Sequence, residues 1–104
     1  MPVFMFISKH TPEVCPAFSE KHRKSISALL EKMESLAKKH GVKMLGAYTD
    51  FPNHTVYWVY EGSFESLQKL QMEPELMDWL SWNSMETKNV LTNEDVSAML
   101  KKLK

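Results

Sequence analysis

The sequence predicts a single α+β domain spanning residues 1–104, because strand-like and helix-like segments alternate along the chain. Three observations carry this prediction: an apolar run near the N-terminus, a long stretch with helical periodicity, and two strand-like segments joined by a short turn. The predicted order is strand, helix, strand, strand, helix and strand, followed by a terminal helix. Without that last helix, this is the order of a ferredoxin-like βαββαβ sandwich.

The first strand and the longest helix come from the N-terminal part of the chain. Residues 3–8 are almost continuously apolar, with β-branched and aromatic members, which is typical of a strand covered on both faces. Residues 17–40 carry apolar side chains at helical spacing, and their other face is charged. Gly41 favours the end of this helix, and Pro12 and Pro16 indicate a loop before it.

A hairpin follows the long helix. Residues 42–50 and 55–60 have the composition of strands, and the Phe-Pro-Asn-His sequence between them has the chemistry of a turn. Gly46 marks a weak point or a bulge in the first of these strands.

The C-terminal part supplies short helices and an edge strand. Ser63 can cap a second helix, and Pro74 suits the start of a further short helical turn. Residues 82–90 have the mixed polarity of an edge strand. Thr92 and Asp95 predict an acidic capping box at the start of a terminal amphipathic helix.

The predicted topology has a consequence for assembly. Right-handed crossovers give the strand order fourth, first, third, second, so that the first and third strands are central. The third strand is apolar on both faces: Val56, Trp58 and Tyr60 alternate with Tyr57 and Val59. The two main helices can cover only one face. The terminal helix could cover part of the other face, and a second copy could cover all of it. We therefore expect a homodimer that packs sheet to sheet.

Composition and charge narrow the range of partners. Thirteen basic residues balance thirteen acidic ones, so the broad positive field needed for nucleic-acid binding is not expected. Aromatic side chains on the third strand loosely suggest an RNA-recognition module, but the basic and glycine positions of that motif are not present there. No apolar run approaches the roughly 20 residues of a membrane span. The chain has one cysteine, so an internal disulfide cannot form and a cytoplasmic location is expected.

Two short motifs nominate a candidate site. Residues 10–16 read His-Thr-Pro-Glu-Val-Cys-Pro, and residues 51–55 read Phe-Pro-Asn-His-Thr. In the predicted topology the first and second strands run parallel, so both motif loops leave the sheet at the same edge. We expect this arrangement to bring His10, Cys15 and His54 within reach of one another.

These side chains have the chemistry of a catalytic site. His10 and His54 could act as general bases, and Cys15 could act as a nucleophile. Cys15 is expected at or just before the start of the first helix, where free N–H groups would stabilise a thiolate. Glu13 and Tyr48 are candidate substrate-binding residues. No role is assigned to the other two histidines, and packing is assigned to the tryptophans near residue 80.

Other interpretations of the same residues stay open. The loop histidines can bond to local backbone, and Cys15 can pack as a small apolar side chain beneath the helix. A metal site is a third interpretation, because His10, Cys15 and His54 have the ligand types of a zinc or copper centre. Their spacing is not an established metal signature. The sequence therefore predicts neither a particular cofactor nor whether the protein is an enzyme.

The motifs also resemble those of a known family. Their order along the chain is an apolar strand, the residues His10 to Glu13, Cys15-Pro16, Gly41-Val42, Gly46-Ala47-Tyr48, Pro52, His54-Thr55 and Tyr57. Over roughly residues 3–72 this pattern resembles an uncharacterised prokaryotic family of the dimeric α+β-barrel class. The resemblance implies a ferredoxin-like fold and a sheet-to-sheet dimer. The class includes cofactor-free monooxygenases, haem-degrading enzymes, isomerases and regulatory ligand-binding modules, so it does not select a function.

Together these observations predict a homodimer that binds or converts a small molecule of unknown identity. Its site would lie at the end of the sheet that carries His10, Cys15 and His54. A non-catalytic interaction or sensing module is the alternative, and a metal-binding protein is the second alternative.

Overall fold

The computed structural model describes residues 2–103 and confirms the α+β class. The main elements in chain order are β1 (Val3–Lys9), α1 (Glu20–Lys39), β2 (Lys43–Asp50), β3 (Thr55–Glu61), α2 (Phe64–Gln71), α3 (Pro74–Ser81), β4 (Ser84–Val90) and α4 (Asn93–Lys102). Two short 3-10 helices, η1 (Pro12–Val14) and η2 (Phe51–Asn53), precede α1 and β3.

The four strands form one antiparallel sheet in the order β2-β3-β1-β4, which is the predicted order and is compatible with a ferredoxin-like fold. Both β1 and β2 pair antiparallel with β3, so they run parallel to each other and end at the same edge. The register of β2 shifts between Met44 and Gly46, where the sequence predicts a bulge.

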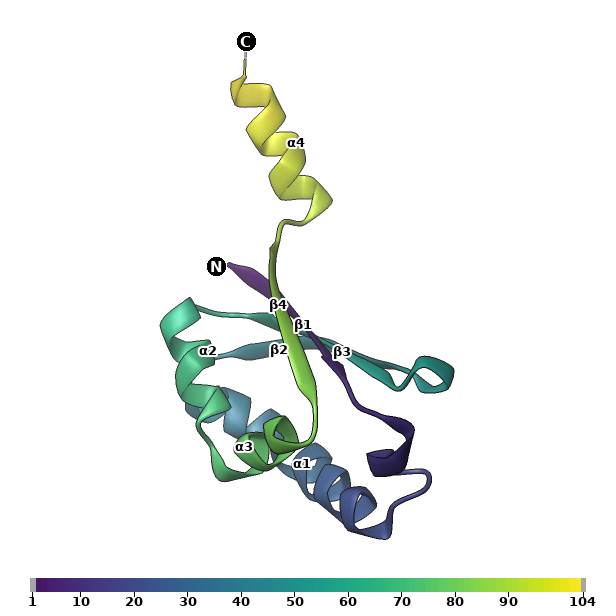
Figure 1. The fold of residues 1–104 in the computed structure, drawn as a ribbon. Coiled ribbons are helices and arrows are strands. Elements are labelled where there is room, and N and C mark those ends of the chain that lie inside the picture. Colours follow the sequence, from purple (N-terminus) through teal and green to yellow (C-terminus); the bar gives the residue numbers. More distant parts are fainter. Residues whose placement is uncertain (1, 104) are drawn as a thin grey trace.

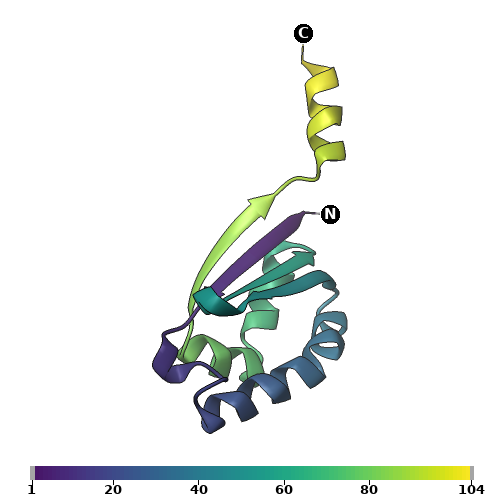
Figure 2. The ribbon, with the colours of Figure 1, turned by 90° about the vertical axis from the view of Figure 1, so that its right-hand side faces the viewer.

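Helices α1, α2 and α3 lie on one face of this sheet (Figures 1 and 2). The hydrophobic core forms between the two layers, where Phe6, Trp58 and Tyr60 from the strands join Leu29 and Met33 from α1. Each such side chain contributes about 1.5–3 kcal/mol when it is fully buried. The opposite face of the sheet has no helix over it among residues 2–103.

Helix α1 begins three residues later than the sequence predicts. Ser19 is its N-cap, and the Ser19 Oγ accepts a hydrogen bond from the His22 N–H at 3.4 Å. Cys15, expected at or just before the start of this helix, precedes the Ser19 N-cap by four residues and so lies outside the first turn of α1. Its carbonyl instead accepts hydrogen bonds from the N–H groups of Phe18 and Ser19, within the turn that leads into the cap.

Helix α4 projects beyond the end of β4, away from the sheet (Figures 1 and 2). Its capping box between Thr92 and Asp95 forms as predicted, but all ten of its residues are exposed. The projection raises the radius of gyration to 15.4 Å, compared with about 13 Å for a compact domain of 100 residues. Within one chain, α4 thus leaves the outer face of the sheet uncovered, contrary to one of the two expectations. Among the described residues, no helix combines the length and apolarity needed to cross a membrane.

Candidate functional site

The two motif loops meet at one edge of the sheet, as their topology predicts. The backbone N–H of His10, just after β1, donates a hydrogen bond to the carbonyl of His54 at 3.2 Å. His54, the residue directly after η2, has the left-handed conformation, with φ 51° and ψ 42°. This conformation is uncommon for residues other than glycine, although histidine is among those that adopt it more readily. The two imidazole rings lie 5.5 Å apart, centre to centre.

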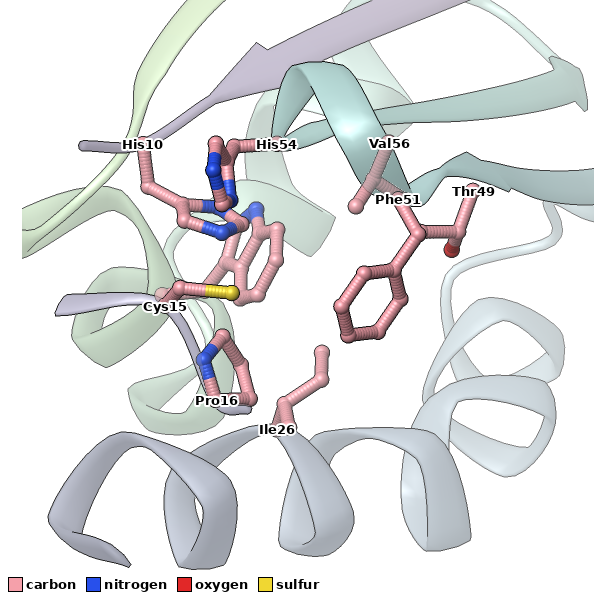
Figure 3. A pocket seen from close by; sticks show the side chains of 9 residues that line it. His10, Cys15, Pro16, Ile26, Thr49, Phe51, His54 and Val56 are labelled. Atoms are coloured by element: carbon pink, nitrogen blue, oxygen red, sulfur yellow. The ribbon is translucent and has the colours of Figure 1, made fainter. Parts of the chain in front are cut away.

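A cavity of about 240 Å³ opens beside these two rings, between the sheet and α1 (Figure 3). Its lining residues are His10, Cys15, Pro16, Ile26, Thr49, Phe51, His54, Val56 and Trp79. The nitrogen and sulfur atoms of this lining lie together at one end, and most of the remaining wall is apolar. One ligand atom from each of His10, Cys15 and His54 lies within 4.8 Å of the others. Cys15 is only 3% exposed, so its thiol is largely shielded from bulk water.

Asn83 fixes the orientation of His10. Its side-chain Nδ2 donates a hydrogen bond to the carbonyl of Trp79 at 3.0 Å, so its Oδ1 is directed at the Nδ1 of His10, 3.1 Å away. Because that oxygen can only accept, His10 must donate from Nδ1. In the neutral imidazole, Nε2 then carries a lone pair and acts as an acceptor.

Two ring nitrogens of this cluster are buried without a partner. Nε2 of His10 and Nδ1 of His54 make no hydrogen bond within residues 2–103. Burial is the main cause that lowers the pKa of His10 below its ordinary value of 6.5. The neighbouring imidazoles of His54 and His22 lower it further, and the hydrogen bond to Asn83 offsets part of the shift. His10 is therefore neutral at pH 7, and its Nε2 can accept a proton, a hydrogen bond or a metal ion.

The structure brings together three of the five predicted site residues. His10, Cys15 and His54 line the cavity. Glu13 is exposed on η1, and its pKa is lowered mainly by hydrogen bonds to its own backbone and to Thr11. The Tyr48 ring is on the outer face of the sheet and is 67% exposed. Neither of these two side chains lines the cavity.

The bulge in β2 explains the position of Tyr48. Met44 pairs with Tyr60, a core residue, but after the register shift Tyr48 pairs with Tyr57, which faces away from the core. An extra residue in a strand reverses the alternation of side chains beyond it. Thr49, next in the chain, consequently faces the cavity.

Sequence reasoning missed Asn83 and underestimated Trp79. The start of β4 pairs with the end of β1, with Ser84 opposite Lys9. The residue before β4 must therefore lie close to the residue after β1, and the predicted strand order contains this signal. Trp79 packs in the core as predicted, where it is 1% exposed, and it also forms a wall of the cavity.

Comparisons with known proteins support the fold and leave the function open. No known family and no curated protein matches this sequence. Among solved structures, the chain is similar to protein Atu4242 from Agrobacterium tumefaciens, a structural-genomics crystal structure, with a TM-score of 0.58 and 14% sequence identity. The match covers 88% of this chain and 92% of that protein. At this identity the similarity concerns the fold alone.

Proposed function

We propose that this protein binds a small, largely apolar molecule in the cavity and recognises one polar group of that molecule with His10, His54 and Cys15. The observation that carries the proposal is the cavity of about 240 Å³, whose polar end presents unpartnered nitrogens. A buried apolar cavity of about 150 Å³ can hold a benzene molecule. The volume here therefore suits a ligand of roughly six to ten non-hydrogen atoms.

The polar end determines which group of the ligand is favoured. With Nδ1 of His10 engaged by Asn83, Nε2 can accept a hydrogen bond from a hydroxyl, thiol or amine. In a catalytic version of this function, His10 or His54 is the acid–base group and Cys15 is the nucleophile. In a sensing version, the same contacts hold the ligand without turnover.

Phenol and toluene test the proposal, because they have nearly the same shape and only phenol can donate a hydrogen bond. We expect both compounds to raise the melting temperature of the metal-free protein, and phenol to raise it more at equal concentration. His10→Gln should remove the difference between them. Equal, negligible shifts for both compounds in the wild-type protein would overturn the proposal.

Filling the cavity is the second test. Ile26→Trp places a larger side chain inside the cavity, so it should abolish the shift with both compounds. Leu30→Trp is the matched control, since Leu30 lies one helical turn further along α1 and is exposed. A response that survives Ile26→Trp would place the binding elsewhere.

We further propose that the protein forms a homodimer of the dimeric α+β-barrel type in the cytoplasm. Met5, Ile7, Tyr57 and Val59 form an apolar strip along β1 and β3 on the face without helices, and they are only half-buried. An apolar strip on central strands favours a partner of matching shape. A second copy offers such a strip. The cytoplasmic location rests on the single cysteine, which a reducing compartment keeps as a thiol.

Light scattering tests the dimer. We expect twice the 12.1 kDa mass of one chain in the wild-type protein. Val59→Lys should yield monomers because it places a charge in the strip, whereas Leu30→Lys, at an exposed position of α1 in the helical layer, should leave the dimer intact. A wild-type monomer at micromolar concentration would contradict this proposal and would leave the cavity proposal standing.

A further inference from the structure

The polar end of the cavity combines three kinds of donor that transition metals prefer. His10 follows β1, Cys15 follows η1 and His54 follows η2, and one ligand atom from each lies within 4.8 Å of the others. Figure 3 shows the Cys15 thiol and both imidazoles converging on the same region. Two imidazoles and one thiolate form a donor set suited to zinc, cobalt or copper, and unsuited to magnesium or calcium.

The unpartnered nitrogens are an independent sign that something binds here. Leaving a buried polar atom without a partner costs about 1–3 kcal/mol. Nε2 of His10 and Nδ1 of His54 both carry this cost at the same end of one cavity. A single metal ion between them would satisfy both nitrogens at once, together with the sulfur of Cys15.

The surroundings of His10 also match those of a metal ligand. Metal-binding histidines usually donate their other ring N–H to a fixed acceptor, which selects the tautomer and orients the ring. Asn83 fills that position: it accepts from Nδ1 of His10 and is itself held by the carbonyl of Trp79. Nε2 is thereby left with a lone pair that can bind a metal ion.

We propose that His10, Cys15 and His54 bind a zinc-class divalent metal ion, with a fourth coordination position open toward the apolar cavity. In the metal-loaded protein this open position, instead of Nε2 of His10, would take the polar group of the ligand proposed above. Three protein ligands with an open position are typical of zinc sites that take a substrate or water as the fourth ligand. On binding, the Cys15 S–H bond is replaced by a metal–sulfur bond, and the proton passes to solvent. Asn83 is a positioning residue for His10.

The geometry requires a modest closure of the three side chains. Zinc–nitrogen distances of about 2.0–2.1 Å and zinc–sulfur distances of about 2.3 Å place tetrahedral ligands roughly 3.3–3.6 Å apart. The ligand atoms lie up to 4.8 Å apart in the described structure, so the closure is about 1.2–1.5 Å at most. All three side chains stand on loops or at element ends, where small torsional changes can achieve this.

Cobalt(II) titration of chelator-treated protein tests the proposal without any organic ligand, so its outcome does not depend on the cavity proposal. We expect the visible bands of tetrahedral cobalt and a sulfur-to-cobalt charge-transfer band, each saturating at one ion per chain. Zinc should abolish both by displacement. A wild-type protein that shows no such bands would overturn the proposal.

Substitutions of the proposed ligands and of Asn83 test which side chains bind the metal. Cys15→Ser should remove the charge-transfer band, and His54→Asn should weaken binding more than about 100-fold, beyond the effect of an outer-shell change. Asparagine is chosen because it tolerates the left-handed conformation of His54 and preserves the turn. Asn83→Ala should weaken binding about 10–100-fold.

His40→Gln is the matched control, because His40 is held by Glu73 at a different place in the fold. Its cobalt affinity should equal that of the wild-type protein. Circular dichroism checks that each variant is folded. Bands that persist unchanged in both Cys15→Ser and His54→Asn would show that the metal binds elsewhere and would refute the site.

Discussion

Two histidine-containing clusters of this protein differ in whether their side chains find all their hydrogen-bond partners within the described chain. At the junction of α1 and α3, His40 Nε2 lies 2.9 Å from Glu73 Oε1, and Lys39 Nζ lies 2.8 Å from the same oxygen. At the cavity, His10 is engaged on Nδ1 only, and Nε2 has no partner within the described chain. The first cluster is complete within one chain and has a structural role. The second is incomplete within residues 2–103, which is why we propose a bound partner for it.

The largest expected effect is the loss of folding stability when Asn83, the hydrogen-bond partner of His10, is replaced. Asn83→Ala should lower the free energy of unfolding by about 1–3 kcal/mol, because it leaves Nδ1 of His10 buried without an acceptor. Urea denaturation of metal-free protein measures this. Asn89→Ala is the control, in the strand that Asn83 directly precedes, and since Asn89 is exposed it should change the free energy by less than about 0.5 kcal/mol. Equal effects of the two substitutions would show that the Asn83–His10 contact is not a stabilising one.

The second effect is the pH dependence that His10 imposes. Its pKa lies below 6.5 in the folded protein, so the unfolded chain binds more protons than the folded one just below pH 6.5. Stability should therefore be complete above pH 6.5 and decline as the pH falls from 6.5 toward the lower folded pKa. Urea midpoints between about pH 8 and about pH 5, with chelator present, measure this window.

The variant Asn83→Asp tests whether His10 causes this loss of stability. A carboxylate at this position would favour the imidazolium and raise the pKa of His10. The loss of stability between pH 6.5 and pH 5 should then shrink or change sign. A decline of the same size in both proteins would mean that another group governs this window.

The sequence predicted which loops meet at the site better than it predicted the direction of individual side chains. The meeting of His10, Cys15 and His54 follows from strand order and from short loops, which crossover rules determine. The position of Tyr48 depends on one register shift at Gly46, and the sequence indicated that bulge without its effect on the residues beyond it. Asn83 was not predicted because its role depends on the pairing of β4 with β1, which brings it next to His10.

Helix boundaries and helix docking were less predictable for a different reason. Periodicity assigned residues 17–19 to α1, but capping by Ser19 delayed the start of the helix and removed Cys15 from its N-terminus. The pattern of α4 was correct, and its capping box formed. Periodicity defines an apolar face and does not say what covers it, so the projection of α4 could not be foreseen from local sequence.

The smallest expected effect on stability comes from the cluster of Glu73, Lys39 and His40. Hydrogen bonds from Lys39 and then His40 lower the pKa of Glu73 below its ordinary value of 4.5. This stabilisation is present above pH 4.5 and is lost as the pH falls through the lower folded pKa. Glu73→Gln should therefore flatten the stability profile below pH 4.5 only, with a smaller change at pH 7 than Asn83→Ala, because the Lys39 side chain is 63% exposed and solvent screens its ion pair with Glu73. Salt should reduce the effect further. If Glu73→Gln also altered cobalt affinity or the window between pH 6.5 and pH 5, the two histidine clusters would be coupled, and their separation into one complete and one incomplete site would fail.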